Sequence, residues 1–260
     1  MLRDARLQKI TEILNSNGNA KVSELQAALD VSEMTIRRDL KELENTGVIN
    51  RVYGGALSLK MSNEQEQTFK DRIVANINLK SAIAAHAVTL LSSGSFIFID
   101  ASSTCSELAS RLPENLNLTV VTNSIEVLML LRGKKSIQLI SLGGELSWDK
   151  NTFDGALAID NAELLSVDIC FFSGAGFSAG GIANSGMIGT MLKRTMINKS
   201  KQNYFLADST KFGRNGIITF CKWDKVDLMI TDSGLHDDAR DMLKAQNVNY
   251  TEVSALSPPH

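Results

Sequence analysis

The stretch VSEMTIRRDLKELENTGVINRVYGGAL, residues 31–57, decides how the first part of the chain folds. Within it, Ile36, Leu40 and Leu43 recur at three- and four-residue spacing, which places their side chains on one stripe of an α-helix. Such a stripe must be buried against other elements. We therefore predict a helix over 32–45 with one apolar face.

The opposite face of this predicted helix is polar and basic. At about 100° per residue, Met34, Arg38 and Lys41 share its centre. Thr35 and Arg37 flank them. A buried back and a basic, hydrogen-bonding front suit a helix that enters the major groove of DNA. The alternative is that the two arginines only solvate an exposed helix, paired with glutamates three or four residues away.

Two further helices are predicted before this one. The first covers 3–16, where leucine and isoleucine recur at helical spacing. The second follows almost at once, and the hydroxyl of Ser23 would cap it while Gln26 reaches back to form a capping box. Three helices in this order, joined by short turns, are typical of a helix-turn-helix domain.

A hairpin is predicted directly after the third helix. Residues 48–53 are strand-like, and the glycine pair at 54–55 is typical of a turn. This wing would offer Arg51 and Tyr53 to the phosphate backbone of DNA. The expected DNA contacts are Ser32, Met34, Thr35, Arg37, Arg38, Lys41, Arg51 and Tyr53.

Length and composition limit what else the chain can be. Its 260 residues exceed one typical domain, and its formal net charge is −2, so DNA binding must come from the arrangement of charges. The sequence has no run of eighteen apolar residues and no secretory signal, which predicts a cytoplasmic protein without a membrane span. The three cysteines are far apart and lack metal-ligand spacing, so we expect no metal and no cofactor.

The rest of the chain alternates between apolar runs and amphipathic stretches. SFIFID at 95–100 and VDLMIT at 226–231 are two of these runs, and the alternation is typical of an α/β fold with a parallel, Rossmann-like sheet. A polar stretch with a short helix around 69–77 precedes the first run. The predicted division is a winged helix over 1–57, a linker over 58–78 and a larger α/β domain over 79–254.

Most of the apolar runs end in small or polar residues. In a doubly wound parallel sheet these ends lie along one edge, where ligands bind. The sharpest example is DASST at 100–104, where a strand feeds a hydroxyl-rich turn that opens a helix and suits an anion such as phosphate. Capping of that helix alone is the alternative. Lys211 follows another strand end, where its ammonium would neutralise a phosphate. The candidate ligand residues are Asp100, Ser102, Ser103, Thr104, Thr122, Asn123, Gly143, Gly144, Glu145, Gly174, Asp208 and Lys211.

Both halves of the chain resemble the DeoR-type bacterial transcription regulators. The first half does so over 31–57, and in the second half DASST, TVVTNS, LGGEL, FFSGAG, GGIANS and LADSTKFGR stand in the order of that family's effector domain. The resemblance implies a recognition helix over 32–45. It also implies a sensor domain that binds a phosphorylated sugar or related metabolite and has a fold similar to ribose-5-phosphate isomerase. Departures from the family pattern are Ser102 and Ser103 in the first loop, Gly176 in place of an acid, and the pair at 188–189.

These observations predict a repressor of a carbohydrate utilisation operon that binds double-stranded operator DNA and is released by a sugar phosphate. A homo-oligomer is expected, because one short recognition helix reads few base pairs. One alternative is a sugar-phosphate isomerase fused to a DNA-binding module, with Asp100, Glu145 and Asp208 as candidate bases. Another is an architectural DNA binder without an effector. We expect no enzyme, because two positions that carry acids in the isomerase relatives lack them here.

Overall fold

The computed structural model divides the chain into two compact units, Met1–Gln67 and Thr68–His260. The residues that the structure describes are 3–17, 19–46, 49–52, 55–58, 69–187, 189–214 and 216–255. None of the helices within these ranges is long and apolar enough to cross a membrane.

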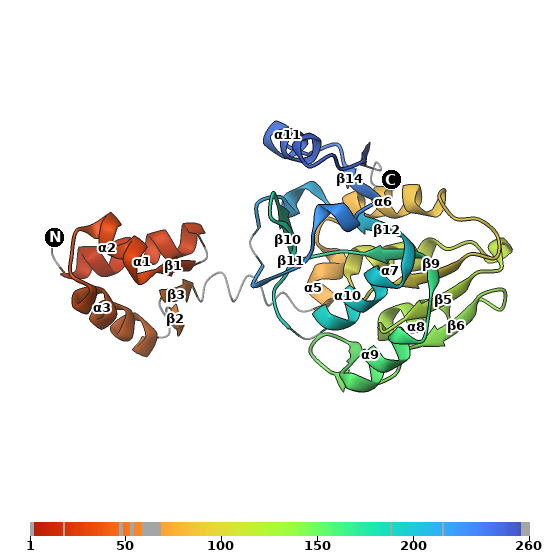
Figure 1. Cartoon of the computed structure of the whole chain (residues 1–260), viewed down its shortest axis with the longest axis horizontal. Helices are drawn as coiled ribbons and strands as arrows, with labels where there is room; N and C mark the ends of the chain where they lie inside the picture. Colours follow the sequence, from red (N-terminus) through yellow and green to blue (C-terminus); the bar gives the residue numbers. More distant parts are fainter. Residues whose placement is uncertain are drawn as a thin grey trace. The chain divides into compact units, whose positions relative to one another are not determined.

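The first unit is a winged helix, as predicted (Figure 1). Its elements are α1 (Arg3–Asn17), β1 (Asn19–Lys21), α2 (Val22–Leu29), α3 (Glu33–Asn45), β2 (Ile49–Val52) and β3 (Gly55–Ser58). The three strands form one antiparallel sheet in the order β1-β3-β2. Ile10, Leu14, Leu25, Ile36 and Leu40 are at most 1% exposed and form the core between the helices. Burial of one stripe of each helix therefore holds the unit together.

Two local details of this unit differ from the prediction. The capping position of α2 is Lys21, whose backbone N–H donates to the carboxylate of Glu24 at 2.9 Å; Ser23 lies inside the helix. The helix starts early because β1 leads directly into it. Gly55 belongs to β3 rather than to a turn. A Cβ there would collide with the carbonyl of Ala20 in β1, so pairing of these strands requires glycine.

The second unit is built on a seven-stranded parallel sheet, as predicted. Its strands are β4 (Phe96–Ile99), β5 (Thr119–Thr122), β6 (Gln138–Ser141), β9 (Val167–Phe172), β12 (Ser200–Leu206), β14 (Leu228–Asp232) and β15 (Tyr250–Val253). Their spatial order is β15-β14-β12-β9-β4-β5-β6. The winding direction thus reverses between β4 and β9, and a crevice opens at such a switch point beyond the carboxyl ends of the strands.

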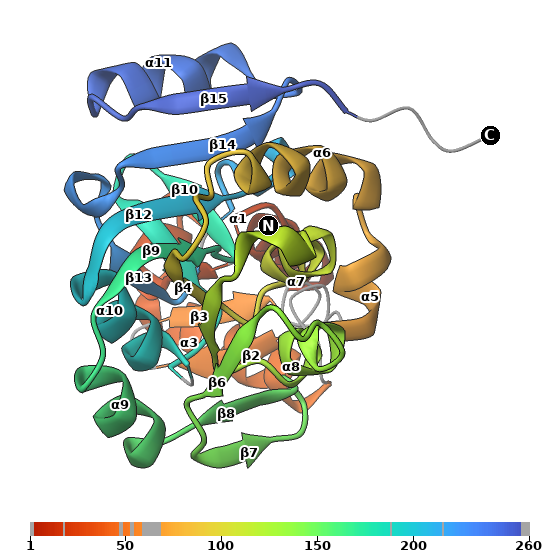
Figure 2. The ribbon, with the colours of Figure 1, turned by 90° about the vertical axis from the view of Figure 1, so that its right-hand side faces the viewer.

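Helices cover both faces of the sheet, which gives three layers (Figure 2). One face packs against α6 (Ile77–Val88), α7 (Ser103–Arg111) and α8 (Ile125–Leu131). The other packs against α9 (Ala156–Glu163), α10 (Thr190–Asn198) and α11 (Asp237–Ala245). In β4, Ile97 and Ile99 point to the first layer and Phe98 to the second, because side chains alternate along a strand.

The second unit also contains several shorter elements. They are the hairpin β7 (Glu145–Ser147) and β8 (Thr152–Asp154), the three-stranded sheet of β10 (Gly176–Ser178), β11 (Gly181–Asn184) and β13 (Ile218–Cys221), and the 3-10 turns η1 (Glu114–Leu116), η2 (Ser209–Lys211) and η3 (Trp223–Lys225).

The stretch predicted as a linker over 58–78 is partly structured. Helix α5 (Phe69–Val74) lies within the second unit and packs on α7, and α6 already begins at Ile77. Phe69 is buried, and the Lys80 ammonium donates to two carbonyls at the end of α5. These contacts hold residues 69–78 in the second unit, and the short helix expected around 69–77 is present as α5.

Candidate functional site

The outward face of α3 carries the predicted DNA contacts. Ser32 caps the helix: its Oγ accepts from the Thr35 N–H at 3.3 Å. Met34 is 82% exposed, Arg38 and Lys41 are also exposed, and Thr35 is half-buried. Because Ile36, Leu40 and Leu43 face the core, the basic side chains on the opposite face of α3 are exposed to solvent.

The arginine pair of α3 is not symmetric. Arg37 makes an exposed ion pair with Glu33 at 2.7 Å, as the alternative interpretation expected. Arg38 has no ion pair or side-chain hydrogen bond with any described residue, and the same holds for Lys41. Arg38 and Lys41 are therefore the cations of this face whose donors remain available for phosphate or base edges.

A buried ion pair that the sequence reasoning missed braces α3 against α1. The guanidinium of Arg6 contacts the carboxylate of Asp39 through two hydrogen bonds of 2.6 and 3.2 Å. Asp39 is fully buried. The available signal was an acidic residue between Arg38 and Leu40 on the apolar side of the helix. The pair fixes the orientation of the basic face.

The wing is present as the hairpin β2–β3. Arg51 lies in β2, in register with Ala56 of β3. Tyr53 lies outside the described residues. The hairpin places the backbone of β2 where the sequence expected a wing, and the contacts of Arg51 and Tyr53 with DNA stay predictions.

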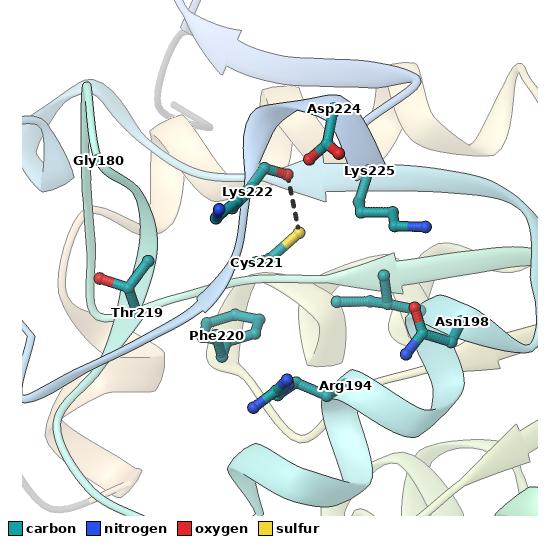
Figure 3. A pocket seen from close by; sticks show the side chains of 10 residues that line it. Gly180, Arg194, Asn198, Thr219, Phe220, Cys221, Lys222, Asp224 and Lys225 are labelled. Carbon is teal, nitrogen blue, oxygen red and sulfur yellow. Dashed lines mark hydrogen bonds between the residues drawn. The ribbon is translucent and has the colours of Figure 1, made fainter.

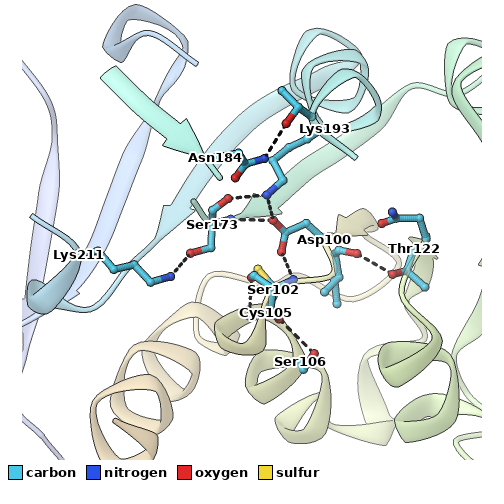
Figure 4. A network of polar contacts seen from close by, with 12 residues as sticks. Asp100, Ser102, Cys105, Ser106, Thr122, Ser173, Asn184, Lys193 and Lys211 are labelled. Atoms are coloured by element: carbon cyan, nitrogen blue, oxygen red, sulfur yellow. Dashed lines mark hydrogen bonds and ion pairs between the residues drawn. The ribbon is translucent and has the colours of Figure 1, made fainter. Parts of the chain in front are cut away.

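The second candidate site lies at the switch point of the parallel sheet (Figure 4). Asp100 follows β4 and is 1% exposed. Its Oδ1 accepts from the Ser102 N–H at 2.8 Å, and its Oδ2 accepts from the Ser173 N–H at 2.9 Å and pairs with Lys193 at 2.8 Å. Burial favours the neutral acid, but Lys193 and the other donors outweigh it, so the pKa of Asp100 is lowered. Asp100 therefore joins the loops that follow β4 and β9.

Two lysines converge on Ser173 from different elements (Figure 4). Lys193 of α10 donates to its carbonyl at 2.6 Å, and Lys211 of η2 donates to its hydroxyl at 2.8 Å. Burial lowers the pKa of Lys211. Lys193 was missed by the sequence reasoning, although a lysine between the apolar Leu192 and Met196 was a signal.

The N-terminus of α7 retains unused donors. Ser102 caps the helix, because its Oγ accepts from the Cys105 N–H at 3.2 Å. The N–H groups of Ser103 and Thr104 have no partner among the described residues, as is normal for the first turn. The Thr104 side chain is fully buried, and its Oγ1 also lacks a partner there. Capping and anion binding are thus compatible. Ser102 caps the helix, and the N–H groups of Ser103 and Thr104 remain as donors for an anion.

Further charged groups surround this helix end. Lys80 of α6 is 3% exposed, and burial followed by the charge of Lys211 lowers its pKa to about 8. Asp208 is buried, and its Oδ1 accepts from the Thr210 hydroxyl at 2.5 Å and the Asn76 amide at 3.4 Å. Asp208 is therefore held within the loop after β12.

Other predicted ligand residues are used by the fold itself. The Thr122 hydroxyl donates to the Ile99 carbonyl at 2.7 Å, and the Asn123 amide donates to the Phe153 carbonyl at 3.1 Å. These bonds tie β5 to β4 and to the β7–β8 hairpin. Glu145 is exposed on that hairpin. Thr122 and Asn123 therefore already have partners within the fold, and the contacts of these three residues with a ligand stay predictions.

The glycines of the candidate site have packing reasons. Gly143 and Gly144 have φ of +64° and +110°, and a Cβ on Gly144 would collide with the carbonyl of Asp154. A Cβ on Gly174 would lie 2.6 Å from Ile182. At Gly176, which departs from the family pattern, any side chain would collide with the backbone of Arg214. The backbone at Arg214, which follows Lys211, therefore packs directly against Gly176.

A separate pocket of about 450 Å³ lies on the other side of α10 (Figure 3). Its charged lining is Arg194, Lys222, Asp224 and Lys225, all exposed. The ring of Phe220 lies between it and Lys193, whose Nζ is 5.1 Å from the ring centre. None of the predicted ligand residues lines this pocket, and its cations are solvated, so the buried donors at α7 are the better candidate for a specific anion site.

The first unit has a basic helix and a hairpin wing, and the second is an α/β unit with several lysines near its switch point. This combination is typical of a DNA-binding transcriptional regulator with a sensor domain. Residues 6–62 match the DeoR-like helix-turn-helix domain, and residues 75–233 match the DeoR C terminal sensor domain. The chain belongs to the DeoR family of transcriptional regulators.

Relatives of known name agree with this assignment. The chain is 38% identical over 254 residues, 97% of its length, to the uncharacterized HTH-type transcriptional regulator YulB of Bacillus subtilis, of which 98% is covered. It is 30% identical to the lactose phosphotransferase system repressor of Streptococcus mutans, with 97% of this chain and 99% of that one covered. Both names describe regulators, and this protein is a regulator rather than an enzyme.

Solved structures give a distant match. Ribose 5-phosphate isomerase A of Methanocaldococcus jannaschii aligns with a TM-score of 0.39 and 20% identity over 53% of this chain and 55% of that one. This likeness is a distant one of fold alone.

Proposed function

We propose that this regulator represses a carbohydrate utilisation operon, and that a phosphorylated sugar bound at the start of α7 releases it from operator DNA. The proposal rests on one observation: the N–H groups of Ser103 and Thr104 have no partner among the described residues, and lysine side chains lie near them. Support also comes from a 30% identical relative named as a lactose phosphotransferase system repressor.

The chemistry of the site favours a phosphate monoester. Its oxygens accept from the N–H groups of Ser103 and Thr104 and from the Thr104 hydroxyl, at the positive end of the α7 dipole. The half-buried Lys211 supplies a neighbouring charge, and its ammonium donates a hydrogen bond to Ser173. Charge-assisted hydrogen bonds of this kind are about twice as strong as neutral ones. The site therefore selects for the anionic group, and the sugar part extends toward the edge of the sheet.

The DNA contacts fall to α3 and the wing. In this proposal Arg38 and Lys41 lie against the major groove, and Arg51 and Tyr53 of the wing contact phosphates. One such helix covers few base pairs, and each good bidentate base contact discriminates by about 1–3 kcal/mol. A homo-oligomer that places two or more recognition helices on the operator supplies the remaining specificity.

The two activities are coupled by linkage. A sugar phosphate that binds better to the DNA-free state lowers the affinity for the operator. The operator must then lower the affinity for the sugar phosphate by the same factor. A coupling of about 1–3 kcal/mol changes affinity by about 5- to 150-fold. Measurement of both affinities on the same protein tests whether one equilibrium connects the two sites.

The experiment begins with selection of a binding duplex from a random DNA pool, followed by anisotropy titrations in the presence of individual sugar phosphates. At least one sugar phosphate is expected to weaken binding of the selected duplex, while the same sugar without phosphate has no effect. If no member of a broad pentose and hexose phosphate panel binds or changes the titration, the effector part of the proposal fails. If no duplex is enriched, the operator part fails.

A further inference from the structure

Helix α5 is the first described element after residue 58 of the winged-helix unit, and it reaches the candidate phosphate site. It packs on α7, whose N-terminus carries the unused donors. The Lys80 ammonium donates to the carbonyls of Arg72 and Ala75 and so secures the end of α5. A ligand contact on α5 would therefore lie next to the chain that leads to the DNA-binding unit.

Arg72 of α5 is the cation whose donors are not fully used. In the described structure Lys193 pairs with Asp100, and Lys211 donates to Ser173. By contrast, the Nε of Arg72 is buried and has no hydrogen-bond partner among the described residues. Its guanidinium carbon lies 5.6 Å from the centre of the Phe69 ring. A buried donor without a partner is costly, so its retention needs a reason.

The surroundings of Arg72 point to the start of α7. Burial lowers the pKa of Arg72, and the carboxylate of Asp100 acts in the opposite direction, so the guanidinium lies within electrostatic range of Asp100 in the loop that leads to α7. The cluster contains four cations, Arg72, Lys80, Lys193 and Lys211, and two buried carboxylates, Asp100 and Asp208, and Glu107 of α7 also acts on Lys80. The cations outnumber these carboxylates, which favours binding of an anion such as phosphate.

We propose that Arg72 binds the phosphate of the effector together with Ser103 and Thr104, so that effector binding strengthens the existing attachment of α5 to the sensor domain. The inference rests on the proposed function, because it assigns a residue and a consequence to the same ligand site. The guanidinium presents its donors in a plane that matches two phosphate oxygens. Occupation of the site thereby acts on α5, the first described element after the winged-helix unit in the sequence.

A charge-neutral variant of Arg72 tests the contact. Inorganic phosphate is titrated calorimetrically into the full-length protein, into Arg72→Gln and into Lys70→Gln. Lys70 is an exposed lysine of the same helix. Arg72→Gln is expected to weaken phosphate binding about 10- to 100-fold, since hydrogen bonds to charged groups contribute about 1.5–3 kcal/mol. Lys70→Gln should stay within about twofold of the unmodified protein, because it removes only a solvated charge.

Hydrogen exchange on the unmodified protein gives a test that does not depend on how the variant folds. Phosphate is expected to slow exchange of the amides of α5 by at least about tenfold and to leave α11 on the far layer unchanged. Phosphate binding that Arg72→Gln does not weaken, with no added protection of α5, overturns the inference and leaves the proposed function intact. Absence of binding by inorganic phosphate and by every sugar phosphate removes the proposed function, and the inference with it.

Discussion

The two cationic regions of this protein are built in opposite ways. On α3 the cations are exposed, and the helix beneath them is held by the buried pair of Arg6 and Asp39. At the start of α7 the cations are buried or half-buried, and each lysine is directed by a named acceptor. Exposed charges act through a long-range field that salt screens. Buried charges cost desolvation and act only on a ligand of matching shape. The difference suits α3 to a polyanion and α7 to one small anion.

The largest effect that would sharpen this contrast is expected from Lys193→Met. The substitution leaves the buried Asp100 carboxylate without its partner, and loss of one member of a buried ion pair costs about 3–5 kcal/mol. Urea denaturation of the sensor domain should show this loss, with the winged helix unaffected. The double variant with Asp100→Asn removes the stranded charge and is expected to recover much of the stability. A stability equal to that of the unmodified protein at neutral pH would show that Asp100 does not depend on Lys193.

This pair also defines a pH dependence. The pKa of Asp100 is lower in the folded protein than in the unfolded chain, so its stabilising contribution is present above the unfolded value of about 3.9. It is lost as the pH falls through the folded value. The acid limb of the stability curve should therefore flatten in the double variant.

The second effect concerns α3. Arg38→Ala is expected to reduce discrimination between the selected duplex and random DNA by about 1–3 kcal/mol, because its donors are free for base contacts. Arg37→Ala serves as the matched control. Its side chain is already paired with Glu33, so its effect should be smaller. Anisotropy titrations of both duplexes give the ratio directly. Equal losses on selected and random DNA in Arg38→Ala would mean that the residue contacts phosphates only.

The wing offers a complementary test of the exposed charges. Arg51→Ala is expected to weaken binding to all sequences alike and to reduce the slope of log K against log salt by about 1, as loss of one phosphate contact does. The same titrations at several salt concentrations measure this slope. An unchanged slope would remove Arg51 from the phosphate contacts.

The sequence was sufficient for the parts of the molecule that follow local rules. The stripe of Ile36, Leu40 and Leu43 predicted α3, and the apolar runs predicted the seven strands of the parallel sheet. Both signals depend on periodicity within a few residues. The α7 turn at 100–104 was likewise readable, because a strand end, hydroxyls and a helix start are adjacent in the chain.

The residues that complete the two sites could not be predicted from local sequence patterns. Arg72, Lys193 and the partner of Asp39 come from segments far from the residues they serve. Their importance arises from three-dimensional packing: Lys193 looks like an ordinary helical lysine until Asp100 lies beside it. Thr122 and Asn123 show the converse, since polar residues at a strand end can also form hydrogen bonds within the fold itself. In the sequence alone, a polar residue that binds a ligand and one that bonds within the fold look the same. Only contacts between distant segments distinguish them.

The third effect separates the ligand site from the DNA site. Lys211→Ala is expected to weaken the response to a sugar phosphate about 10- to 100-fold while leaving operator affinity unchanged, because the lysine belongs to the buried cluster. Lys222→Ala is a matched control, since Lys222 lines the other pocket of the same domain. Dose-response curves for release of the selected duplex measure both. A response unchanged in Lys211→Ala but lost in Lys222→Ala would move the effector to that pocket.

The smallest expected effect is the uptake of a fraction of a proton when phosphate binds. This uptake distinguishes buried cations from exposed ones directly. Burial and the charge of Lys211 lower the pKa of Lys80 to about 8, so at pH 8 about half of the Lys80 side chains are neutral. A bound phosphate dianion favours the ammonium and raises this pKa, so binding at pH 8 should take up as much as about half a proton. A phosphate monoester, with a second pKa of about 6, is already dianionic there and adds little. Calorimetry in two buffers with different ionisation enthalpies measures the uptake. Lys80→Met should abolish it, whereas Lys70→Met on the exposed side of α5 should not; uptake that persists without Lys80 would assign the proton to another group of the cluster.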